Sequence, residues 1–119
     1  MTKAEREQQI NTLRDVLVIA KGEAYKLRDT EDGGTCNFDS PAINLDKMKE
    51  RFSMTKKAIE QAIQDAGLRC YDWKSFGSHY LIISGFTWGQ GNRRTRMAEK
   101  AEEVLRAAGY FTTMYYQMD

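Results

Sequence analysis

Two helical patterns and two strand patterns follow one another in the sequence LDKMKERFSMTKKAIEQAIQDAGLRCYDWKSFGSHYLIIS, residues 45–84. Apolar residues recur at steps of three and four in residues 45–52 and again before Gly67, which is the spacing that lines one face of a helix. Ser53 or Thr55 can cap the second helix, because a hydroxyl accepts a hydrogen bond from an unpaired N–H of the first turn. Gly67 favours an end directly after it. We therefore expect two short helices joined by a tight turn.

The second half of this segment predicts a β-hairpin. Residues 68–74 and 79–84 are rich in aromatic and branched side chains, which favour the half-buried environment of a strand. Between them lies SFGS, residues 75–78, whose length and glycine fit the loop of a hairpin.

A long helix is expected before this segment, over residues 3–28. Its apolar residues recur at alternating steps of three and four, which places them on one face. The sequence DGG at residues 32–34 interrupts the helical pattern, and an irregular loop is expected to continue to Ser40-Pro41. The apolar face consists of Ile10, Leu13, Leu17, Ala20, Ala24 and Leu27.

One more helix and a last strand are expected after the hairpin. Asn92 is placed to cap a helix that ends before Gly109. Residues 110–118 are rich in aromatic, threonine and methionine residues and predict a strand.

The predicted fold class is α+β. The expected elements are a long N-terminal helix, a helix-turn-helix-like pair, a β-hairpin, a helix and a C-terminal strand, which form a small, mainly antiparallel sheet with helices packed on it. At 119 residues the chain can bury one hydrophobic core but is short for two. We therefore expect a single domain over residues 1–119.

Residues 42–84 resemble winged helix-turn-helix domains, through the tight junction of the two helices, the helix end at Gly67 and the hairpin that follows. In that family the second helix of the pair enters the major groove of DNA, and the hairpin contacts the backbone as a wing. The resemblance implies a nucleic-acid-binding protein; the alternative is a helix packed on a sheet with a solvated, charged face. The DNA-facing residues that it implies are Thr55, Lys56, Lys57 and Gln61 on the helix, and Lys74 or His79 on the wing.

A glycine- and arginine-rich turn, GQGNRRTR at residues 89–96, is a second candidate site for nucleic acid or another anion. Its glycines let backbone N–H groups approach an anion, and the following helix start adds unpaired donors. Arg93, Arg94 and Arg96 can bind a phosphate or carboxylate, and Trp88 can stack on a base. The turn lacks the third glycine of a dinucleotide fingerprint and the Lys-Ser or Lys-Thr of a nucleoside-triphosphate loop. The alternative interpretation is an ordinary strand-to-helix connection.

The alternative function is a protein-interaction module. An acidic segment is suited to bind either a protein partner or the arginines of the same chain. The terminal strand is suited to an interface, through its tyrosines or by pairing with a partner strand, including that of a second copy in a homodimer. Small chains of this kind resemble proteins of phages and mobile elements, some of which inhibit host defence proteins. The residues of this alternative are Asp29, Glu31, Asp32 and Asp39 in the acidic segment, and Tyr115 and Tyr116 in the strand.

Composition argues against other classes. The formal net charge is +1, so any attraction to nucleic acid depends on local clusters. Neither a signal-peptide core nor a membrane-spanning run occurs in the sequence, and we expect a soluble cytoplasmic protein without a membrane partner. Cys36 and Cys70 are expected as reduced thiols. Because His79 is the only histidine, neither catalysis nor a metal site is expected, and no cofactor.

Overall fold

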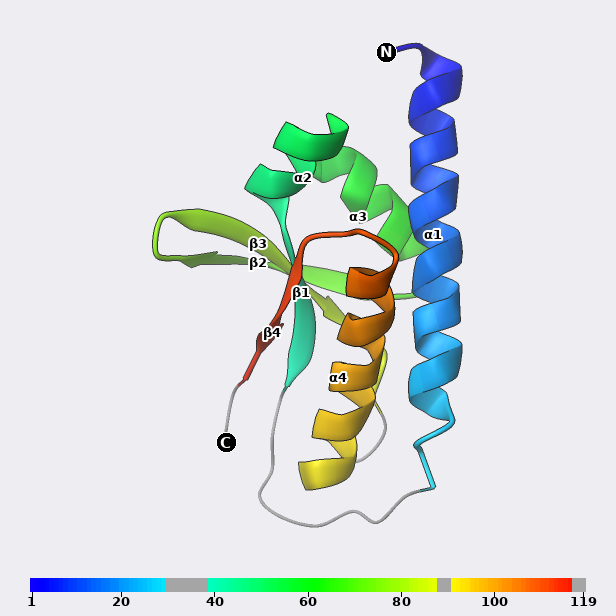
Figure 1. Cartoon of the computed structure of the whole chain (residues 1–119), viewed down its shortest axis with the longest axis vertical. Coiled ribbons are helices and arrows are strands. Elements are labelled where there is room, and N and C mark those ends of the chain that lie inside the picture. Colours follow the sequence, from blue (N-terminus) through cyan, green and yellow to red (C-terminus); the bar gives the residue numbers. More distant parts are fainter. Residues whose placement is uncertain (30–38, 88–90, 117–119) are drawn as a thin grey trace.

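Four helices and four strands make up the part of the chain that the computed structural model describes, residues 1–29, 39–87 and 91–116 (Figure 1). They follow one another as α1 (Lys3–Tyr25), β1 (Ser40–Asn44), α2 (Leu45–Phe52), α3 (Lys56–Asp65), β2 (Arg69–Ser75), β3 (Ser78–Ser84), α4 (Gly91–Ala107) and β4 (Thr112–Tyr115). The predicted α+β class and the long N-terminal helix are confirmed.

The sheet is antiparallel and has the strand order β2-β3-β1-β4. Its inner strand β1 was missed by the sequence analysis, which placed Ser40 and Pro41 in a loop. The strand has only five residues and all of them are buried, so its sequence shows no alternation of apolar and polar side chains. Pro41 is tolerated because the pairing of β1 with β3 begins only at Ala42, which lies opposite Ile82.

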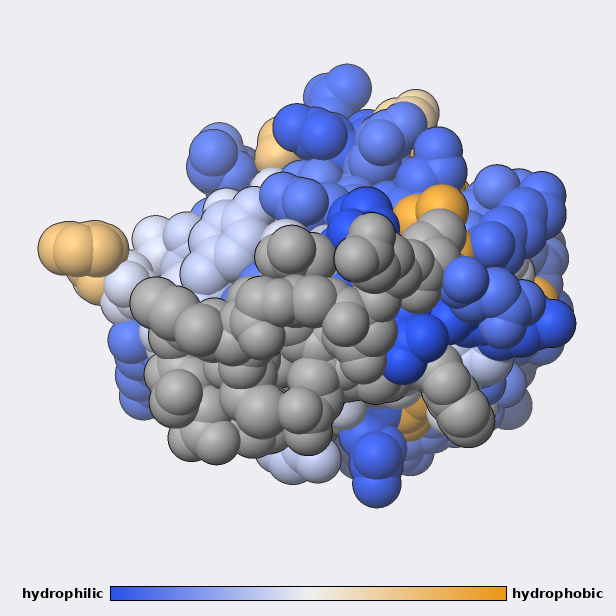
Figure 2. All heavy atoms as spheres, turned by 90° about the horizontal axis from the view of Figure 1, so that it is seen from below, coloured by the Kyte–Doolittle hydropathy of each residue, from blue (hydrophilic) through white to orange (hydrophobic). Residues whose placement is uncertain are grey.

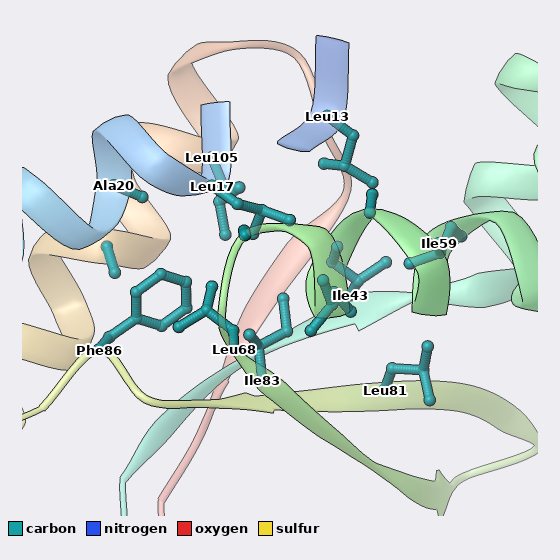
Figure 3. Packing of buried hydrophobic residues seen from close by; sticks show 14 of the residues in the cluster. Leu13, Leu17, Ala20, Ile43, Ile59, Leu68, Leu81, Ile83, Phe86 and Leu105 are labelled. Carbon is teal, nitrogen blue, oxygen red and sulfur yellow. The ribbon is translucent and has the colours of Figure 1, made fainter. Parts of the chain in front are cut away.

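Helices α3 and α4 pack on the sheet, and α1 packs against both helices and closes the core (Figure 1). Figure 3 shows side chains from α1, α3, α4 and the strands meeting between the layers. The apolar face predicted for α1 is confirmed at Leu13, Leu17, Ala20 and Ala24, which are fully buried. The helix ends at Tyr25, three residues before the predicted position, and continues as turns to Asp29.

The helix pair and the hairpin match the sequence prediction closely. Helix α2 ends at Phe52, and its C-cap Ser53 adopts a left-handed conformation with φ of 55°. Thr55 caps α3 by accepting a hydrogen bond from the Ala58 N–H at 3.2 Å. Gly67, with φ of 78°, follows the end of α3. This local geometry is favourable because a hydroxyl satisfies the helix start and glycine tolerates positive φ.

The C-terminal part differs from the prediction in two boundaries. Helix α4 begins at Gly91, so Asn92 lies within its first turn and not before it. Strand β4 covers Thr112–Tyr115 only, whereas residues 110–118 were expected. Tyr110 and Phe111 instead pack against Phe52, with ring centroids 5.8 and 6.1 Å apart, and residues 117–119 lie outside the described residues.

Candidate nucleic-acid-binding surface

Helix α3 has a buried face and an exposed face. Ile59, Ala62 and Ile63 are fully buried in the core. The polar side chains predicted to face DNA lie on the other side: Thr55, Lys56, Lys57 and Gln61 are all exposed. The amphipathic spacing of the sequence is enough to produce this division.

A hydrogen-bonded cluster connects the start of α3 to the hairpin. The Lys56 ammonium donates to the Asp72 carboxylate on β2, with distances of 2.9 and 3.0 Å to its two oxygens. The same carboxylate lies 3.1 Å from Nε2 of His79 on β3. The backbone N–H of His79 in turn donates to Asp46 at the start of α2, at 3.1 Å. The two helices and the hairpin therefore form one continuous surface.

The charges of this cluster stabilise each other. The hydrogen bond to Asp72 raises the pKa of Lys56. The hydrogen bond from Lys56, and a weaker one from His79, lower the pKa of Asp72. Both side chains are partly exposed, so the ion pair orients the groups more than it stabilises the fold.

Lys74 belongs to the same surface. Alternate residues of a strand point to the same side, so Lys74 shares the side of β2 on which Asp72 meets α3. Its cross-strand partner is His79. Within the described part of the chain, neither Lys57 nor Lys74 takes part in an ion pair.

The arginine turn lies elsewhere. Helix α4 begins at the end of the molecule opposite to α2 (Figure 1), so Arg93, Arg94 and Arg96 do not join the lysines of α3. All three are partly buried. Nη1 of Arg93 donates a hydrogen bond, 2.9 Å long, to the backbone carbonyl of Arg28, which comes after the last residue of α1 in the sequence.

One acidic residue, Asp39, lies beside the arginine turn. Asp39 is 3% exposed, and its carboxylate accepts a hydrogen bond from the Thr95 hydroxyl at 2.6 Å. Burial lowers the pKa of Arg94, and the nearby Asp39 opposes that shift. Asp39 therefore interacts with the arginine turn inside the chain, as one of the two interpretations of the sequence held. Asp29 is exposed, 3.9 Å from Arg28.

Three predicted site residues, Glu31, Asp32 and Trp88, lie outside the described residues, as does Cys36.

The two tyrosines of the terminal strand have different surroundings. The ring of Tyr115 packs edge-on against Trp73, with centroids 4.8 Å apart. Tyr116 donates its hydroxyl hydrogen to Glu99 at 2.8 Å, and this bond raises the pKa of Tyr116 to about 12. Beside β4 lies an open cavity of about 440 Å³, lined on its helical side by Glu99, Glu102, Glu103 and Arg106. It is a separate, mainly acidic site.

Asp72 and Asp46, which organise the α3–hairpin surface, were not predicted as site residues from the sequence. The sequence shows Asp72 in a predicted strand and Lys56 at a predicted helix start. That the two form an ion pair depends on how α3 packs on the hairpin. No group of three or more potential metal ligands occurs among residues 1–29, 39–87 and 91–116, and no helix there is long and apolar enough to cross a membrane.

Compared with protein-family models, curated proteins and solved structures, the chain has no significant match.

Proposed function

We propose that this chain is a non-enzymatic DNA-binding protein that places the start of α3 in the major groove and the hairpin β2–β3 against the neighbouring backbone. The observation that carries the proposal is the continuous surface formed by α3 and the hairpin through Lys56, Asp72 and His79. The resemblance of residues 42–84 to winged helix-turn-helix domains supports the same orientation.

Phosphate binding is assigned to the lysines. Lys57 and Lys74 are exposed and carry charges that no described acidic residue neutralises by ion pairing. Lys56 contributes less, because Asp72 already accepts its hydrogen bonds. With two to three phosphate contacts, affinity falls with salt at a logarithmic slope of roughly −2 to −3.

Base recognition is assigned to polar side chains in the first turns of α3. Gln61 can contact adenine through both the oxygen and the nitrogen of its side-chain amide, but in the free protein that nitrogen donates to Asp65 at 2.8 Å. The Thr55 hydroxyl already accepts a hydrogen bond from the Ala58 N–H as the cap of α3. Helix α3 contains no arginine that could make a bidentate contact to guanine. We therefore expect a moderate sequence preference and an affinity that comes mainly from contacts to the DNA backbone.

The test is a fluorescence anisotropy titration of a labelled duplex over a series of salt concentrations. Lys57→Gln combined with Lys74→Gln is expected to weaken binding and to reduce the salt slope by about two. Lys3→Gln combined with Lys26→Gln, at the two ends of α1, removes the same charge from another part of the molecule and should have little effect. Absence of duplex binding by the wild type at low salt would overturn the proposal.

A second candidate is a protein-interaction module of a phage or mobile element that uses β4, for example an inhibitor of a host defence protein. It is favoured by the position of β4 at the end of the strand order and by the acidic cavity beside it. A basic, extended segment would complement both. Glu99→Gln combined with Glu103→Gln, both in the lining of this cavity, should abolish capture of such a partner and leave DNA binding unchanged.

A further inference from the structure

The turn at the tip of the β2–β3 hairpin contains a residue, Phe76, that its turn type does not favour. Ser75 pairs with Ser78, which leaves Phe76 and Gly77 as the two central residues of the turn. Their φ angles are 50° and 78°, so both are left-handed, as a type I′ turn requires. Asn, Asp and Gly are the residues that adopt this conformation readily, whereas a bulky side chain is strained in it.

Burial does not compensate for this strain. Phe76 has a relative exposure of 106%, and its ring belongs neither to the core nor to the partly buried residues around it. Asparagine would therefore suit the folded turn better than phenylalanine does. Strain and complete exposure are two independent observations that point to a contact outside the chain.

The turn also lies where it can reach a partner. Strand β1 pairs with β3 only at residues 80–82, so the hairpin beyond Tyr80 is a two-stranded projection. Figure 1 shows it extending away from α1 and α4, and in Figure 2 an apolar protrusion stands out on the same side. Lys74 and His79 flank the projection directly behind the tip.

We propose that Phe76 is an apolar wedge that enters a base step of duplex DNA and kinks it. This inference rests on the proposed function and names how the hairpin would contact its target. Exposed phenylalanines of minor-groove proteins act in this way, since partial unstacking of a step allows more protein surface to meet the bent duplex. The cationic side chain of Lys74 behind the ring is complementary to the phosphates beside the opened step. Flexible pyrimidine–purine steps such as TA are the easiest to open.

The test uses a duplex with a central TA step, 2-aminopurine next to that step, and a donor and acceptor dye at its two ends. Binding is measured by anisotropy, unstacking by 2-aminopurine fluorescence and bending by energy transfer. The wild type should bind, raise the fluorescence and increase the energy transfer. Phe76→Asn and Phe76→Gly suit the turn, so both should fold and still bind DNA, but lose the fluorescence and energy-transfer changes. Phe76→Trp should retain them.

The outcomes separate the wedge from DNA binding itself. If the Asn and Gly variants unstack and bend the duplex as the wild type does, or if the wild type binds without either signal, the wedge is wrong and the proposed function stands. If the wild type shows no duplex binding at low salt, the proposed function is wrong and the wedge with it. Capture of the wild type, but not of Phe76→Asn, on anionic lipid vesicles without any effect on the duplex would assign the ring to a membrane surface and overturn the wedge.

Discussion

The Asp72 carboxylate on β2 lies 2.9 Å from the Lys56 ammonium in the first turn of α3. This pair brings an acidic group into a surface that would otherwise attract phosphate, because the remaining exposed side chains nearby include Lys57 and Lys74. Asp72 thus orients Lys56 toward the hairpin and at the same time reduces the charge available to an anionic ligand.

Replacing Asp72 by Asn should strengthen DNA binding. The variant releases Lys56 from its ion pair and raises the formal net charge by one unit at the proposed contact surface. We expect tighter duplex binding in anisotropy titrations and a salt slope steeper by about one. Asp15→Asn, on α1, makes the same charge change at a partly exposed ion pair with Arg14 and is the matched control. Equal effects of the two substitutions would assign the gain to overall charge and contradict this surface.

The same residue should make stability depend on pH in the acidic range. Lys56 lowers the pKa of Asp72 in the folded protein below its ordinary value of 3.8. A carboxylate with a depressed pKa contributes stability that is present above the unfolded pKa and is lost as the pH falls through the folded pKa. The difference in melting temperature between the wild type and Asp72→Asn should therefore be constant near neutral pH and shrink below pH 3.8. A difference that grows in acid would contradict the ion pair.

The inner strand β1 should be essential for stability. Ile43 is fully buried between the sheet and the helices, and its strand joins β3 to β4 (Figure 3). Ile43→Ala should lower the free energy of unfolding by about 2–4 kcal/mol, since it removes buried methylene and methyl groups and leaves a cavity. Urea denaturation measures the change. Ile19→Ala, at a position on α1 that is 56% exposed, is the control, and a similar loss there would show that β1 has no special role.

Local sequence signals predicted most of the elements, and contacts between distant residues explain what they missed. Thr55 and Gly67 act within a few residues of themselves, so the ends of α3 were predictable. Strand β1 exists because Ala42 and Ile43 pair with β3 and β4, both of which come much later in the chain. A buried five-residue segment with a proline carries little signal of its own.

The candidate site divides in the same way. The exposed positions of Lys56 and Lys57 follow from the helical period, which any amphipathic helix obeys. The partner of Lys56 depends on the packing of α3 against β2, which no spacing rule gives. The separation of the lysines from Arg93 and Arg94 likewise depends on the path of the chain through the sheet.

The arginine turn should prove to be part of the scaffold. Asp39 is buried, accepts a hydrogen bond from Thr95 and lies near the partly buried Arg94. Asp39→Asn should therefore lower the free energy of unfolding by about 1–3 kcal/mol, because it weakens a charge-assisted hydrogen bond in a buried place. Thr95→Val removes the donor of the same bond. The double variant should cost less than the sum of the single ones, since residues that share a bond are coupled.

Duplex binding measured on the same variants decides between scaffold and site. If α3 and the hairpin form the DNA surface, Asp39→Asn should leave affinity and salt slope at their wild-type values while the protein remains folded. An increase in affinity on neutralising Asp39, with little change in the free energy of unfolding, would instead identify the arginine turn as the anion-binding site. It would also remove Lys57 and Lys74 from the principal role, because the two regions lie at different ends of the molecule and cannot share one short contact with DNA.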